Sequence, residues 1–161
     1  MLALFAPDVA TGSHHREHPG LVGAKYGQRV MLAAPGSPRE VATVVGPFFE
    51  RVVVHRWLEL EVDLPLAITQ DGALALPLDL HFKKPFHPSR HWSPYVGLGP
   101  TVEITLRPVR SVAVGLSIVT GTYLWVSPRI GFDIDVAYEL VPYRKSLRSG
   151  LTVGAGPVWR F

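Results

Sequence analysis

The last twelve residues, Gly150–Phe161, read GLTVGAGPVWRF. Their odd-numbered positions carry Leu, Val, Ala, Pro, Trp and Phe, whereas their even-numbered positions are mostly small or polar. Successive side chains of a strand point to opposite faces, so this pattern predicts a strand with one apolar face and one small or polar face. An aromatic residue at the chain end, Phe161, suits a strand that closes a barrel and stops at the edge of a lipid bilayer.

The composition is unusual for a soluble domain. Of 161 residues, 47% are hydrophobic and only 18% are charged, against about 25% charged in average soluble proteins. No stretch approaches the roughly 20 continuous apolar residues that a membrane helix needs, which leaves buried or lipid-facing strands in one domain. The net charge of +3 and the lack of a basic motif argue against nucleic-acid binding. The absence of Cys excludes disulfides and thiolate metal sites.

Residues 1–19 are expected to lie outside the barrel domain, which we place at 20–161. The first twelve residues contain an apolar run without the basic region of a complete signal peptide, so we interpret them as a signal-peptide remnant or a linker. The cluster His14-His15-His18 has no carboxylate or further histidine at a supporting spacing. We therefore expect a solvated segment there rather than a metal site.

Alternation of apolar and polar residues recurs along the chain and predicts eight strands. Turn residues separate them, most clearly at Thr69–Gly72, which reads TQDG. In the second strand Pro47 cannot donate a hydrogen bond to a neighbouring strand, so it predicts a bulge and leaves the inward face of that strand undefined. The expected strands are 20–32, 41–54, 58–66, 74–83, 92–106, 111–118, 130–140 and 150–161.

Alternation alone does not show whether the apolar face points into a soluble barrel or outward into lipid. Strands of about 10 to 15 residues exceed the 5 to 6 usual in soluble sheets and suffice to cross a bilayer. Gly, Ala, Ser and Thr dominate the polar face, as the tight lumen of an eight-stranded barrel requires. All four Trp residues, Trp57, Trp92, Trp125 and Trp159, fall at the end that holds the C terminus, where an interfacial girdle is expected. Trp57 and Trp125 have inward parity, so we expect them past a bulge or under the barrel floor.

The chain resembles the small bacterial outer-membrane β-barrels of the eight-stranded OmpA-like class. The resemblance rests on SPYVGLGP (Ser93–Pro100), the strand Gly131–Leu140 and the C-terminal GLTVGAGPVWRF, and it spans strands three to eight. It implies an all-β fold, an eight-stranded antiparallel up-and-down transmembrane β-barrel of the outer membrane, with the lipid bilayer as its partner. It also implies that Trp159 and Phe161 form the signal read by the outer-membrane assembly machinery.

In this register the inward positions carry most of the charged residues of the strands. They are Glu59, Glu61, Asp63, Asp79, His81, Lys83, Glu103, Asp133, Asp135, Glu139 and Arg160. Buried carboxylates need cationic partners, so we interpret this set, with Lys25 and Arg29 as further candidate bases, as the charge network of a packed polar lumen. The excess of acids keeps a narrow, cation-preferring pore as an alternative.

The loops at the opposite end are short and basic. Their cations, whose charge suits lipopolysaccharide phosphates, are Arg107, Arg110, Arg144, Lys145 and Arg148. Ordinary solvated loops are the alternative interpretation.

The expected function is a structural or interaction role of an outer-membrane barrel, without a cofactor or a metal. The second hypothesis is a soluble periplasmic, lipocalin-like barrel that binds a hydrophobic ligand, and it places Leu60, Leu78, Val114 and Ile134 inside. An enzyme that modifies lipid A would need a Ser-His pair near the outer rim. The sequence shows no His partner for Ser111 or Ser117.

Overall fold

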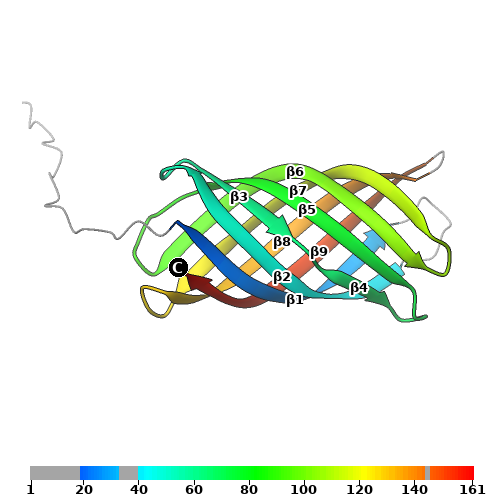
Figure 1. The fold of residues 1–161 in the computed structure, drawn as a ribbon, viewed down its shortest axis with the longest axis horizontal. Coiled ribbons are helices and arrows are strands. Elements are labelled where there is room, and N and C mark those ends of the chain that lie inside the picture. Colours follow the sequence, from blue (N-terminus) through cyan, green and yellow to red (C-terminus); the bar gives the residue numbers. More distant parts are fainter. Residues whose placement is uncertain (1–18, 33–39, 144–145) are drawn as a thin grey trace, which may run out of the picture.

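A computed structural model of the chain describes residues 19–32, 40–143 and 146–161, and these form a closed barrel of tilted antiparallel strands (Figure 1). The N- and C-terminal strands meet at one seam, where β1 pairs with β9. The strand elements are β1 (Gly20–Leu32), β2 (Glu40–Val54), β3 (Leu58–Asp63), β4 (Leu66–Thr69), β5 (Leu74–Pro85), β6 (Trp92–Arg107), β7 (Ser111–Trp125), β8 (Ile130–Tyr143) and β9 (Ser146–Arg160). Their positions confirm the alternation read from the sequence.

Elements β3 and β4 together make one strand of the barrel. Both pair with β2 and with β5, and the register does not change between them. The interruption falls at Leu64 and Pro65, and the register places Pro65 opposite Pro77 of β5. Neither proline has an amide hydrogen to donate, so the ladder breaks there. The barrel therefore has eight strands, as predicted.

The strand register fixes the width of the lumen. Hydrogen-bonded neighbours, followed once around the barrel, run Gly20, Arg51, Leu60, Phe82, Leu98, Ile118, Tyr138, Leu151 and Val30. The path thus returns to β1 ten residues from its start. Eight strands with this stagger tilt by about 40° and enclose an interior that side chains can just fill.

The bulge predicted at Pro47 is wrong. The pairing of β1 with β2 runs through Ala24 and Pro47 without a shift. Pro47 is tolerated because it lies beside the strand break, where its carbonyl oxygen accepts a hydrogen bond from the Leu64 amide at 3.0 Å. The bulge lies instead between Val52 and Val54, opposite β3, and this irregularity precedes the turn that leaves Trp57 59% exposed.

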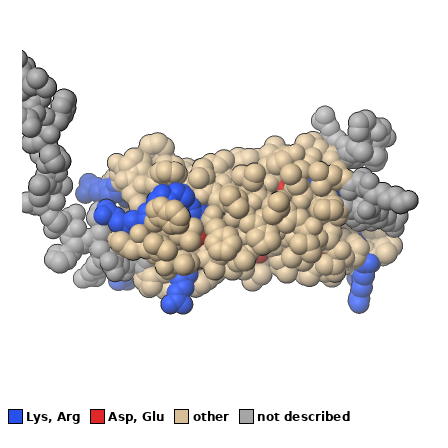
Figure 2. Space-filling view, turned by 90° about the horizontal axis from the view of Figure 1, so that it is seen from above, with Lys and Arg blue, Asp and Glu red and all other residues tan. Residues whose placement is uncertain are grey.

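Aliphatic side chains cover the outside of the barrel. Leu98, Ile118 and Val114 are 62%, 58% and 60% exposed, and Ile134 faces outward with them. Leu60 and Leu78 share this outward parity, although their side chains are half-buried. Figure 2 shows that the middle of one face is almost free of charge, with Lys and Arg gathered towards the ends. This orientation contradicts the lipocalin-like alternative. Among the described residues, no helix is long and apolar enough to cross a membrane.

Candidate functional site in the polar lumen

The lower half of the lumen, near the C terminus, is organised around Lys83. This side chain comes from β5 and has no exposed surface. Its Nζ donates hydrogen bonds to Glu61 Oε2 at 2.6 Å and to Glu50 Oε2 at 3.1 Å. A third donation goes to the Tyr123 hydroxyl at 2.7 Å, which in turn donates to Glu50 Oε2 at 2.7 Å. The ammonium group also lies 3.7 Å from the centroid of the Tyr95 ring, so its charge is enclosed on all sides.

A second lysine joins carboxylates from two strands. Lys25 Nζ of β1 lies 2.8 Å from Asp135 Oδ2 of β8 and 3.3 Å from Glu61 Oε1 of β3. It also pairs with Asp63 at 3.4 Å and with Asp133 at 3.3 Å. Because Glu61 contacts both lysines, the two clusters form one ion-pair network across the barrel.

Further from the C terminus, the Arg29 side chain crosses the lumen from β1 to carboxylates of β6 and β8. Its guanidinium pairs with Glu139 of β8 and lies 2.7 Å from Glu103 Oε2 of β6. The Arg29 side chain is 4% exposed. Glu139 is fixed further by the Thr152 hydroxyl, which donates to its Oε1 at 3.1 Å. The contacts thus connect β1, β6, β8 and β9.

Glycines make room for the largest lumen side chains. Gly121 is the register partner of Tyr95, and a Cβ added at Gly121 would lie 2.5 Å from the Tyr95 hydroxyl oxygen. Gly131 is paired with Trp125 in the same way, with a Cβ distance of 2.8 Å to the indole ring. Gly121 and Gly131 therefore have a packing role, because each leaves space for a bulky side chain on the adjacent strand.

Hollows lie on both sides of Arg29 in the lumen. A cavity of about 50 Å³ lies between Lys25 and Arg29, and it is lined by Asp63, Asp79 and His81 among others. A larger hollow of about 240 Å³ occupies the mouth beyond Arg29, at the end away from the C terminus. Arg29 contacts both hollows and separates them. The lumen is hollow at the mouth away from the C terminus, is crossed by Arg29 in the middle, and is packed with side chains at the other end.

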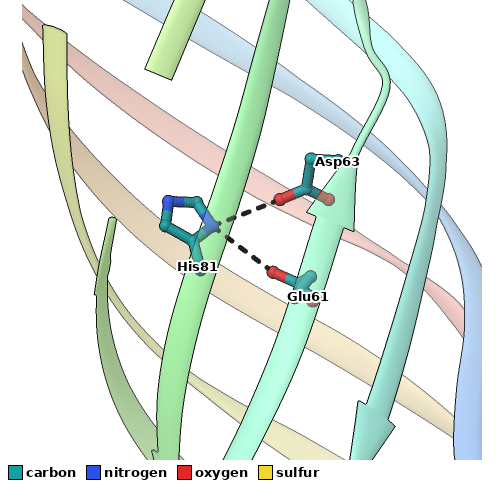
Figure 3. A group of neighbouring side chains, drawn as sticks. All are labelled: Glu61, Asp63 and His81. Atoms are coloured by element: carbon teal, nitrogen blue, oxygen red, sulfur yellow. Dashed lines mark ion pairs between the residues drawn. The ribbon is translucent and has the colours of Figure 1, made fainter. Parts of the chain in front are cut away.

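Glu61, Asp63 and His81 lie close enough to resemble a metal-ligand set (Figure 3). His81 Nδ1 is 3.6 Å from Glu61 Oε1 and 3.5 Å from Asp63 Oδ2. Both carboxylates, however, already pair with Lys25, and Glu61 also pairs with Lys83. A divalent cation would have to displace an ammonium group from the same oxygens, so the geometry favours an ion-pair cluster.

The structure brings His81 and Ser117 together, a contact that the sequence did not reveal. His81 Nε2 lies 2.9 Å from Ser117 Oγ, while Nδ1 faces Asp63, so the order of groups resembles a Ser-His-Asp triad. The setting differs from an active site. Ser117 is 1% exposed, it does not line either hollow, and it sits inside the barrel rather than at a lipid-facing rim. A substrate acyl group has no space beside Ser117 Oγ.

All the charged residues expected in the lumen face it. Described residues contribute nine inward carboxylates, namely Glu50, Glu59, Glu61, Asp63, Asp79, Glu103, Asp133, Asp135 and Glu139. Their cationic counterparts are Lys25, Arg29, Lys83 and Arg160, with His81 as a further base. Arg160 lies half-buried with its Cζ 3.3 Å from the Trp125 ring centroid.

Sequence reasoning left out Glu50, but it did have Lys25 and Arg29 as candidate bases of the lumen, and the structure places both there. The signal for both cations was present, because they share the inward parity of β1. Glu50 follows Phe48 at the same parity, and Phe48 is 2% exposed. Since Pro47 causes no bulge, uninterrupted counting along β2 would have assigned Glu50 to the lumen.

The residues expected at the two ends lie on the surface where described. Trp159 is 48% exposed, and Phe161 is 49% exposed and stacks on Phe49 with ring centroids 5.9 Å apart. Arg107 and Arg110 are exposed beside the mouth, and the half-buried Arg148 lines the hollow there. Arg144 and Lys145 lie outside the described residues, as do the N-terminal histidines.

Comparisons with known proteins identify the fold. No protein-family model and no curated protein matches the sequence. Solved structures do match: Neisserial surface protein A (NspA) is 15% identical with a TM-score of 0.71, covering 89% of this chain and 97% of that one. The N-terminal β-barrel domain of Pseudomonas aeruginosa OprF is 12% identical with a TM-score of 0.66, covering 90% and 100%. OprG from Pseudomonas aeruginosa is 12% identical with a TM-score of 0.57, covering 91% and 98%. The chain has the fold of the small eight-stranded outer-membrane β-barrels.

Proposed function

We propose that this protein is a non-conducting barrel of the bacterial outer membrane with a structural or interaction role, and that it is not an enzyme. The observation that carries this proposal is the closed lower lumen, in which Lys83 is fixed between Glu50, Glu61 and two tyrosine rings. Ions have no continuous path past these groups. The apolar outer face supplies the lipid contact that such a role requires.

Planar-bilayer recording tests the closed lumen. The wild-type barrel is expected to give no steady conductance. A double variant, Tyr95→Ala with Tyr123→Ala, removes two rings whose centroids are 4.9 Å apart in the lumen and is expected to conduct. The matched control, Tyr26→Ala with Tyr138→Ala, removes exposed rings from the outside and is expected to remain closed. Steady wild-type conductance would overturn the proposal.

A narrow cation path is the second candidate, and the excess of lumen carboxylates favours it over an anion path. Nine carboxylates face four Lys and Arg side chains among the described lumen residues. If the wild type conducts, reversal potentials in a salt gradient should show preference for cations. If only the Tyr95 and Tyr123 double variant conducts, its conductance should also prefer cations, and the proposal that the wild-type lumen is closed stands.

The cations at the mouth are proposed to contact lipopolysaccharide. Arg107 and Arg110 project from the turn between β6 and β7, where arginine suits bidentate contacts with phosphate groups. Arg144, Lys145 and Arg148 complete the proposed set. Replacing Arg107 and Arg110 by Gln should reduce retention of lipopolysaccharide during purification, whereas Arg90→Gln at the other end should leave it unchanged. Equal retention by the three proteins would argue for solvated loops.

Trp159 and Phe161 are proposed to serve as the recognition signal for the assembly machinery. Both side chains are exposed at the end of the chain and available for contact. Replacing Phe161 by Ser should slow insertion in cells while leaving spontaneous folding into thin lipid vesicles almost unchanged. Equal losses in both assays would instead assign Phe161 a packing role against Phe49.

A further inference from the structure

The end of the barrel that holds the C terminus carries a basic collar, which we define as Arg51, Arg56, Lys84, Arg90 and Arg129. Arg56, Arg90 and Arg129 come from the three turns at this end, β2 to β3, β5 to β6, and β7 to β8, whereas Arg51 and Lys84 lie in β2 and β5 close to those turns. Four of the side chains are exposed and Lys84 is half-buried. Blue side chains at this end of the barrel are visible in Figure 2.

No exposed Asp or Glu side chain accompanies the collar among the described residues. Glu50 and Glu59, the acids nearest to this end, point into the lumen. The exposed acids of the described chain, Glu40 and Asp71, lie at the opposite end. No Asp or Glu side chain on the described surface therefore compensates the five cations of the collar, and this end of the barrel carries an excess of positive charge.

Aromatic side chains place the collar at a membrane surface. Trp57, Trp92 and Trp159 are 59%, 48% and 48% exposed at the same end, as expected for a girdle at the boundary between lipid and water. Lys84 connects the two features, since its Nζ lies 5.6 Å from the Trp57 ring centroid and donates to the Arg56 carbonyl oxygen at 3.1 Å. Cations at the level of an aromatic girdle lie where lipid headgroup phosphates lie.

We infer that the basic collar selects anionic phospholipid headgroups, of the phosphatidylglycerol type, from the adjacent leaflet. The partner is a lipid surface because the cations surround the barrel at the girdle instead of gathering in a pocket. A cation near an anionic lipid surface contributes roughly 1 kcal/mol, or about fivefold in affinity, as an upper bound per residue. Five such residues around the barrel would enrich anionic lipid next to the protein. This inference does not depend on whether the lumen conducts.

Tryptophan quenching by brominated lipid tests the inference, because three of the four Trp side chains lie at the collar and Trp125 is enclosed in the lumen. The barrel is reconstituted in equimolar phosphatidylcholine and phosphatidylglycerol, with bromine on one lipid or the other. Brominated phosphatidylglycerol is expected to quench several-fold more effectively, and high salt should reduce the difference. Equal quenching by the two lipids would overturn the inference.

A charge-neutralised variant with Arg51, Arg56, Lys84, Arg90 and Arg129 all replaced by Gln is expected to lose the preference. The control, Glu40→Gln, removes an exposed charge at the opposite end and should keep the preference. The fold of the five-residue variant is checked by comparing boiled and unboiled samples on a gel. If it does not fold, neutralising the cations beside one turn at a time should give graded losses of the preference for phosphatidylglycerol. A preference that survives in every folded collar variant would contradict the assignment. So would a collar that binds insoluble peptidoglycan but shows no lipid preference.

Discussion

Lys83 Nζ and Glu61 Oε2 lie 2.6 Å apart inside the barrel, and neither side chain has any exposed surface. They belong to neighbouring strands, β5 and β3. An enclosed ion pair is stable only when the remaining donors and acceptors are also satisfied, and here Glu50 and Tyr123 complete the set. The pair therefore belongs to a network that holds β2, β3, β5 and β7 in one register.

Replacing Lys83 by Met should destabilise the barrel strongly, because Glu50 and Glu61 would remain buried with less positive charge near them. Breaking a buried pair in this way costs about 3–5 kcal/mol. Urea unfolding in lipid vesicles measures the change in the free energy of unfolding. The control is Lys84→Met, one residue further along β5 and facing outward, which should change it by less than about 1 kcal/mol. Equal effects of the two substitutions would show that the lumen network does not stabilise the fold.

Tyr123→Phe removes one hydroxyl and keeps the ring. That hydroxyl donates to Glu50 and accepts from Lys83, so its loss leaves a charged network short of one partner. The expected loss of unfolding free energy is about 1–3 kcal/mol. Tyr138→Phe, on the lipid-facing side, provides the control and should be nearly neutral. A neutral Tyr123→Phe would indicate that water takes over both hydrogen bonds.

Two exposed aliphatic residues should respond differently to the same substitution. Ile118 lies midway along β7 and is 58% exposed, whereas Val109 lies in a turn and is 71% exposed. In a bilayer, Ile118→Arg should destabilise the barrel by about 2–4 kcal/mol, because the charge enters the apolar band, and Val109→Arg should have little effect. The free energy of unfolding of both variants is measured in lipid vesicles and compared with that of the wild type. If both are harmless, the outer face meets water.

The turn between β4 and β5 offers a pH-dependent group outside the membrane-spanning strands. The Thr69 hydroxyl and the Ala73 amide donate hydrogen bonds to the Asp71 carboxylate and lower the pKa of Asp71. A depressed pKa means that the stabilisation is present above the unfolded value, about 3.9, and is lost as the pH falls through the folded value. An NMR titration should show a midpoint below that of an unfolded Asp. Thr69→Val should raise the midpoint, and an unchanged midpoint would rule out the hydroxyl as the cause.

The alternation of residue types was sufficient to predict the strands and, except in the second strand, their inward faces. Trp125, which was expected past a bulge or under the barrel floor, lies inside the barrel at the end of β7, on the face that its parity indicated. The predicted bounds of the first strand, Gly20 to Leu32, coincide with β1. This success has a physical basis. One face of each strand carries the apolar residues of the barrel exterior, and a period of two then defines the other face.

The sequence did not predict which side chains contact one another inside the lumen. The contact between His81 and Ser117 joins residues 36 positions apart on non-neighbouring strands, so it depends on the stagger of two strand pairs. Parity shows that a side chain points inward but not which residues meet there. Glu50 was missed for a local reason, since Pro47 suggested a bulge that the adjacent strand break makes unnecessary.

The central claim, that the aliphatic outer face meets lipid, is tested most directly by membrane retention combined with gel mobility. The chain is expressed behind a secretory signal, membranes are washed with urea or carbonate, and boiled and unboiled samples are compared. We predict that the protein stays in the membrane and that the unboiled form migrates differently from the boiled form. A protein that washes off as a soluble monomer would contradict the account.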